Sequence, residues 1–147
     1  MFHFRFETLL NARRHAEECL QKELSEARQA LTDEQSVLRD KKNARRQCLQ
    51  EQRRKQHQGF RGPDMLLFGN YLKRLERDID AQQKRVATAE RRVGQKRQAL
   101  IEAMKKRKII EKLKEKDQES HLRALAELER KFMDAAAARS HSAARSG

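Results

Sequence analysis

The sequence QGFRGPD, residues 58–64, decides the fold of this 147-residue chain. It holds two of the five glycines and the only proline. Glycine adopts backbone angles that a helix cannot use, and a proline disfavours helical geometry at the residue before it. Asp64 can then cap a new helix, because its carboxylate accepts hydrogen bonds from the free N–H groups of the first turn. The segment therefore predicts a loop between two helices.

The residues before this loop, 1–57, carry apolar side chains at alternating spacings of four and three. The spacing is clean from Leu20 to Leu38, and charged residues occupy more of its positions toward the loop. The predicted seam of this first helix consists of Phe6, Leu10, Arg13, Glu17, Leu20, Leu24, Ala27, Leu31, Glu34, Leu38, Lys41, Arg45 and Cys48.

The residues after the loop, 65–134, repeat the spacing more regularly. Five consecutive heptads of this kind are typical of a coiled coil. The predicted seam of this second helix consists of Phe68, Leu72, Leu75, Ile79, Gln82, Val86, Ala89, Val93, Lys96, Leu100, Ala103, Arg107 and Ile110. The pattern resumes loosely at Leu122, Leu125, Leu128 and Phe132.

A short loop favours antiparallel neighbours. We therefore predict an all-α fold, a long antiparallel two-helix coiled coil, or helical hairpin. Pairing outward from the loop sets Leu38 near Gln82 and Phe6 near Lys116. A parallel homodimer is the alternative arrangement.

The last residues, 135–147, have no apolar periodicity and end in Ser and Gly. We expect them to form a frayed, disordered tail. Gly94 lies inside the second helix, where glycine costs about 1 kcal/mol relative to alanine. It marks either a bend or a close approach of the two helices.

The composition excludes an ordinary globular domain, since 39% of the residues are charged and only 5% are aromatic. Disorder is the alternative for so charged a chain, but the apolar residues are periodic rather than merely sparse. No apolar run approaches the ~20 residues of a membrane span, and the opening residues are too mixed for a signal peptide. Cys19 and Cys48 lie too far apart on one helix for a disulfide, which fits a reducing cytoplasm.

The sequence lacks the patterns of a catalytic or metal site. The five histidines are scattered, no pair has HExxH spacing, and no glycine-rich phosphate loop is present. Most carboxylates lie three or four residues from a Lys or Arg, as helix-supporting pairs do. We therefore expect no enzyme activity, no metal and no cofactor.

The formal net charge of +13 attracts polyanions, anionic membranes and acidic protein surfaces alike. Basic residues gather in residues 41–55 and 105–116. Nucleic-acid sites usually add aromatic side chains that stack on bases, and membrane-surface helices need a broad apolar face. These two basic clusters have neither feature. A solvated helix surface or an acidic protein partner remains. The alternative functions are a basic adaptor for nucleic acid or anionic membrane, and a homodimeric structural coiled coil.

Four segments resemble the motifs of one protein family, in order and spacing. The opening FRFETLLNARRHAEE (4–18) is similar to that family's Phe-x-Phe-x-x-Leu-Leu start, and YLKRLERDI (71–79) to the start of its second helix. The stretch KRKIIEKLKEKDQES (106–120) resembles its basic run before an acidic segment, and AELERKFMDAAAAR (126–139) is similar to its closing motif. The family that these segments resemble is the FliJ family of flagellar proteins.

The resemblance, which extends to the YscO-like secretion stalk proteins, implies a non-catalytic subunit similar to the gamma stalk of rotary ATP synthases. It implies that the free protein is a monomer without cofactors and does not bind nucleic acid. The implied partners are the hexameric export ATPase FliI (with FliH), the export-gate protein FlhA and export chaperones. The implied location is cytoplasmic, peripherally at the inner membrane.

The resemblance also assigns contact residues. The expected ATPase-binding residues are Phe4, Phe6, Leu9, Leu10, Arg13, Ile109, Ile110, Lys112, Leu113 and Lys116. The expected export-gate-binding residues are Tyr71, Leu75, Asp78 and Gln82.

Overall fold

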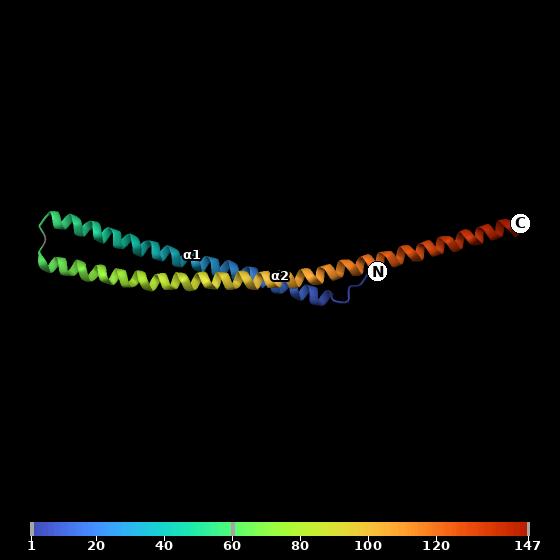
Figure 1. Ribbon diagram of the computed structural model, residues 1–147, viewed down its shortest axis with the longest axis horizontal. Coiled ribbons are helices and arrows are strands. Elements are labelled where there is room, and N and C mark those ends of the chain that lie inside the picture. The colour runs from blue at the N-terminus through green and yellow to red at the C-terminus, as the bar shows by residue number, and fades with distance from the viewer. Residues whose placement is uncertain (1, 60, 147) are drawn as a thin grey trace. The chain divides into compact units, whose positions relative to one another are not determined.

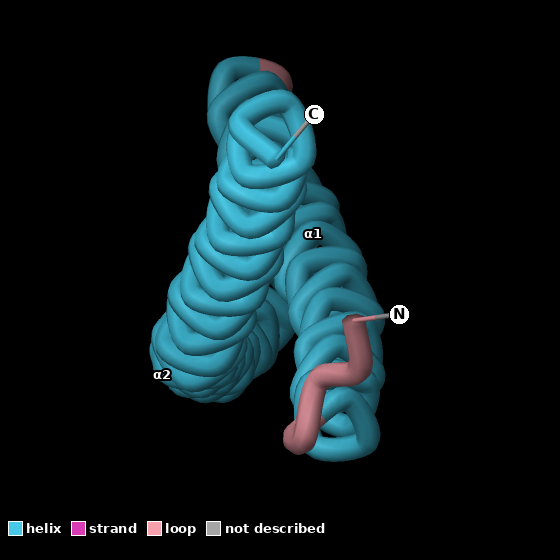
Figure 2. Tube along the Cα trace, turned by 90° about the vertical axis from the view of Figure 1, so that its right-hand side faces the viewer, coloured by secondary structure: helices cyan, strands magenta, loops and turns pink. Residues whose placement is uncertain are grey.

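The structure is a computed structural model that describes residues 2–59 and 61–146. It contains two helices, α1 (Glu7–His57) and α2 (Gly62–Ser146), which Figure 1 labels. The described residues outside the helices, 2–6, 58, 59 and 61, form the short loop segments of Figure 2. The helices pack against each other as a helical hairpin, and the described residues include no strand, so the predicted all-α fold is confirmed.

The hairpin consists of two compact units. One comprises residues 18–101 and the other comprises residues 2–17 with 102–146. Within each unit a segment of α1 lies against a segment of α2, with the two chain directions opposed.

The loop between the helices is shorter than predicted, because α2 begins at Gly62 rather than at residue 65. The N–H groups of Asp64 and Met65 both donate to the Arg61 carbonyl, at 3.1 and 3.2 Å. Pro63 therefore lies in the first helical turn, where its missing N–H is not needed. Asp64 lies inside that turn rather than capping it, and its carboxylate is near the positive end of the helix. Gly59 has a φ of 89°, which explains a glycine at this turn.

In the unit of residues 18–101, the core is the predicted seam. Leu24, Ala27 and Val93 form a buried cluster, with Leu31 and Leu100 packed against it. Burial of the second seam is confirmed throughout, since every predicted residue from Phe68 to Ile110 is buried or half-buried.

The first seam is confirmed except at two positions, Phe6 and Arg45, which are exposed. Phe6 lies in a turn that precedes α1, in which the N–H of Glu7 donates to the Phe4 carbonyl. Helical spacing does not apply before the helix begins, and Phe4 is buried there instead, at 4% exposure.

The register agrees with the prediction to within about one helical turn. Lys114 Nζ lies 2.8 Å from Glu7 Oε2, next to the predicted pairing of Phe6 with Lys116. Gln82 contacts Glu34, one turn from the predicted Leu38, and its amide donates to the Glu34 carbonyl at 2.9 Å and to the Glu34 carboxylate. Gln82, as a seam residue, inserts between residues of the facing helix. Of Glu34 and Leu38, only Glu34 has a side chain that can accept a hydrogen bond from the Gln82 amide.

The predicted disordered tail is not observed for residues 135–146, because α2 continues to Ser146. Alanine and arginine have high helix propensity, so AAAAR continues a helix without tertiary packing. Residues 122–146 are all exposed. Residue 147 lies outside the described residues. At Gly94, an added Cβ would meet no atom within 4 Å, which excludes a close helix approach as the reason for this glycine.

We expect Leu24→Ala to lower the free energy of unfolding by about 2–3 kcal/mol, because Leu24 is 5% exposed within the seam. Leu66→Ala is the matched control, since Leu66 is 66% exposed and should change stability by no more than about 0.5 kcal/mol. Urea unfolding followed by circular dichroism measures both. Equal effects of the two substitutions would contradict the assigned seam.

Candidate functional site

The segment before α1 is fixed to α2 by a small apolar cluster. Phe4, Leu10 and Ile110 are buried together, with Phe2 packed against them. The Phe2 and His121 rings lie 5.5 Å apart, and Lys114 Nζ lies 5.9 Å from the Phe4 ring centroid. Three predicted ATPase-binding residues, Phe4, Leu10 and Ile110, therefore form the core of this unit and position its surface.

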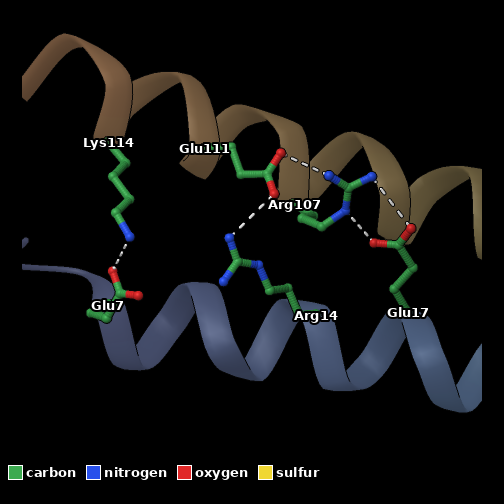
Figure 3. Close-up of polar contacts among 6 residues, drawn as sticks. All are labelled: Glu7, Arg14, Glu17, Arg107, Glu111 and Lys114. Carbon is green, nitrogen blue, oxygen red and sulfur yellow. Dashed lines mark hydrogen bonds and ion pairs between the residues drawn. The ribbon is translucent and has the colours of Figure 1, made fainter. Parts of the chain in front are cut away.

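The same unit holds a network of ion pairs, most of them between α1 and α2 (Figure 3). Arg107 donates to both carboxylate oxygens of Glu17, and its Nη1 donates to Glu111 Oε2 at 2.7 Å. Glu111 also pairs with Arg14 across the helices, at 3.6 Å. Glu17 and Arg107 are mostly buried, with side chains 10% and 20% exposed. The network thus links α1 and α2 through charges at seam positions.

Arg107 carries its charge throughout the physiological pH range. Hydrogen bonds to Glu17, and then to Glu111, raise the pKa of its guanidinium above the usual value, despite an opposing effect of burial. A raised pKa stabilises the fold at every pH below the unfolded value, and this contribution disappears only as the pH rises through the folded pKa. A mildly alkaline pH therefore leaves the Glu17–Arg107 ion pair intact.

The other predicted ATPase-binding residues lie outside the core. Four apolar side chains are substantially exposed, Phe6 (37%), Leu9 (42%), Ile109 (68%) and Leu113 (40%). Lys112 and Lys116 are exposed, and Arg13 is half-buried. Ile109, Leu113 and Lys116 are spaced four and three residues apart, so they share one face of α2. This surface combines apolar anchors with positive charge.

The predicted gate-binding residues divide in the same way. Tyr71 is 50% exposed and Asp78 is also exposed, whereas Leu75 (7%) and Gln82 (1%) are buried in the seam. Tyr71 and Asp78 are seven residues apart, which places them on one face of α2. Leu75 and Gln82 cannot be reached from solvent while the helices are paired.

Reasoning from the sequence missed the ion-pair network as a unit. Its signal was present, because Glu17 and Arg107 are charged residues at predicted seam positions on opposite helices. Glu111 follows Arg107 by one turn, where it can share the same guanidinium.

The described residues contain neither a metal-ligand cluster nor a membrane-spanning helix. Over 2–59 and 61–146, no group of three or more His, Cys, Asp or Glu could hold a metal ion. Neither α1 nor α2, as described, has an apolar stretch long enough to cross a membrane. One shallow hollow between the helices is lined by small and charged side chains, including Ala27, Ala30, Ala89 and Arg92.

Charge reversal tests the network. We expect Arg107→Glu to lower the urea midpoint clearly, because it places a third carboxylate beside Glu17 and Glu111. The double variant Glu17→Arg/Arg107→Glu should recover much of that loss, since it restores an opposite pair. Arg130→Glu is the control, because its pair with Glu127 is largely exposed and should contribute little. A double variant no more stable than Arg107→Glu would show that the pair does not link the helices.

Comparison with known proteins agrees with this architecture. A putative YscO homolog, CT670 from Chlamydia trachomatis, has a similar solved structure, with a TM-score of 0.68 and 20% sequence identity. The similarity covers 100% of this chain and 99% of that one, and at this identity it shows the shared fold alone. No curated protein matches the sequence. Residues 2–146 match the family described as Flagellar FliJ protein. The chain therefore belongs to the FliJ family of flagellar proteins, which are components of the type III export apparatus.

Proposed function

We propose that this chain is a non-catalytic stalk subunit that binds the hexameric export ATPase FliI, with FliH, and the export gate FlhA. The observation that carries the proposal is the FliJ-family match over residues 2–146, on a hairpin of two long helices. The protein hydrolyses nothing itself. It promotes assembly of the ATPase and couples it to delivery of substrates and export chaperones. It acts in the cytoplasm, at the inner face of the membrane.

The proposed ATPase contact is the exposed surface of Phe6, Leu9, Ile109 and Leu113 with the adjacent Lys112 and Lys116. Apolar anchors surrounded by charge are typical of protein interfaces, because the anchors supply affinity and the charges supply orientation. The buried cluster of Phe4, Leu10 and Ile110 holds the segments that carry these residues together. The Glu17–Arg107 pair supports it further by opposing sliding of one helix along the other.

The proposed gate contact is centred on Tyr71. A half-exposed tyrosine offers a large apolar ring and a hydroxyl, which suits a partner surface. Asp78 adds a charge on the same face two turns further along α2. Leu75 and Gln82 hold this part of α2 against α1 and so present Tyr71 indirectly.

The ATPase contact is tested by adding the purified chain to FliI. We expect it to raise both ATP turnover and the hexameric fraction, measured by phosphate release and analytical ultracentrifugation. Ile109→Asn should weaken this stimulation about tenfold, because the polar side chain would not fill the apolar pocket that the proposed contact with FliI requires.

Leu67→Asn is the matched control, because Leu67 and Ile109 are both 68% exposed. It should stimulate FliI as the wild type does. Identical stimulation by the Ile109→Asn variant and the wild type would exclude this surface from the contact.

Substitutions at an exposed residue and at a seam residue test the proposed gate contact separately from stability. We expect Tyr71→Ala to weaken binding to the cytoplasmic domain of FlhA about tenfold, with the urea midpoint unchanged. Gln82→Ala should lower stability by about 1–3 kcal/mol, because the Glu34 carbonyl loses its buried partner. Isothermal titration calorimetry measures the binding. Loss of stability without loss of FlhA binding in the Tyr71→Ala variant would contradict the assignment.

A further inference from the structure

The loop end of the hairpin carries a second apolar surface that the proposed contacts do not use. At the start of α2, Met65, Leu66 and Leu67 are 41%, 66% and 68% exposed. Consecutive residues of a helix point about 100° apart, so these three cover about 200° of its circumference. All described residues of 61–67 are exposed.

This distribution fits a fluid surface better than a protein groove. A groove that receives a helix contacts one stripe, with residues spaced three or four apart. Three consecutive apolar side chains would leave at least one of them facing water in such a groove. The interfacial zone of a bilayer deforms around a helix and accepts side chains over a wide arc.

The charges around this apolar surface suit anionic headgroups. Residues 52–72 contain four basic residues, Arg53, Arg54, Lys55 and Arg61, against one acidic residue, Asp64. All five are exposed. Arg54 also pairs with Glu51 at 2.7 Å, and Lys55 Nζ lies 5.2 Å from the Phe68 ring centroid.

The order of residues along α2 is also that of a membrane interface. Leu67, Tyr71 and Arg74 share one face, because they are spaced four and three residues apart. An apolar side chain is thus followed by an aromatic and then a basic one. Aromatic residues with a polar tip and long basic residues occupy the headgroup level, while leucine lies deeper.

We propose that Met65, Leu66 and Leu67, with Arg53 and Arg61, bind the surface of a bilayer rich in anionic phospholipid. The binding is peripheral and shallow, and it leaves the hairpin intact. It shares no residue with the proposed ATPase contact, and it adjoins the proposed gate contact at Tyr71. Vesicles without other proteins test lipid binding separately from both contacts.

Sedimentation of the full chain with vesicles tests the proposal. We expect binding to vesicles of equal parts phosphatidylcholine and phosphatidylglycerol, and little binding to phosphatidylcholine alone. Leu66→Asn/Leu67→Asn should weaken binding at least about tenfold, because two side chains that enter the bilayer in the proposed complex become polar. Arg53→Gln/Arg61→Gln should weaken it about fivefold per charge. Absence of wild-type binding to the anionic vesicles would overturn the proposal.

Two control variants separate this surface from the general positive charge. Leu122→Asn/Leu128→Asn changes leucines that are equally exposed, at 64% and 63%, in the other unit. Arg97→Gln/Arg139→Gln removes two exposed arginines outside the loop end. The leucine variant should bind like the wild type, and the arginine variant should show only a small loss from its reduced net charge. Losses as large as those of the loop-end variants would overturn the proposal.

A tryptophan probe gives an independent readout, because the chain has no natural tryptophan. We expect the emission of Leu66→Trp to shift to the blue on anionic vesicles and to be quenched by brominated lipid. Leu122→Trp should show neither change. An unchanged Leu66→Trp emission on vesicles that carry the protein down would show that another surface binds lipid.

Discussion

The closure of two narrow apolar seams, one on α1 and one on α2, is the interaction on which the rest of the structure depends. A pair of helices has no interior beyond its line of contact, so nearly all hydrophobic stabilisation comes from about two residues in seven. Leu24, Ala27 and Val93 illustrate this, since they are buried while their neighbours in sequence are exposed. The remaining side chains face solvent, and function must therefore reside on the surface.

The charged residues within the seam serve a different purpose from the leucines. Burying Glu17 and Arg107 costs desolvation free energy that their attraction only partly offsets, so they add less stability than a leucine layer would. A polar pair at seam positions instead favours one alignment of the helices, because any slip leaves a buried charge without its partner. Gln82 and Glu34 form a second polar layer of this kind in the other unit. These two polar layers specify one register of α1 against α2 in a seam whose apolar residues repeat.

The predicted seams were almost fully confirmed because heptad spacing is a local property of the sequence. Phe6 was misplaced because α1 begins after it, and a helix start depends on a turn that spacing does not reveal. The helical state of residues 135–146 was missed because the lack of periodicity was weighed above the propensity of the alanines. Of the contact residues taken from the family resemblance, Leu75 and Gln82 also belong to the predicted seam, and Tyr71 does not. The heptad spacing therefore already separated the buried pair from the exposed tyrosine, as the structure has them.

The exposure of residues 122–146 has a consequence for the dynamics of α2. This stretch is held by its own backbone hydrogen bonds, whereas the turns from Leu75 to Ile110 are also held by the opposite helix. Opening one unpacked turn costs little free energy, while opening a packed turn also exposes the seam. One continuous helix therefore combines a half whose opening costs more free energy with an end whose opening costs less. Such an end can open locally without disturbing the pairing of α1 with α2.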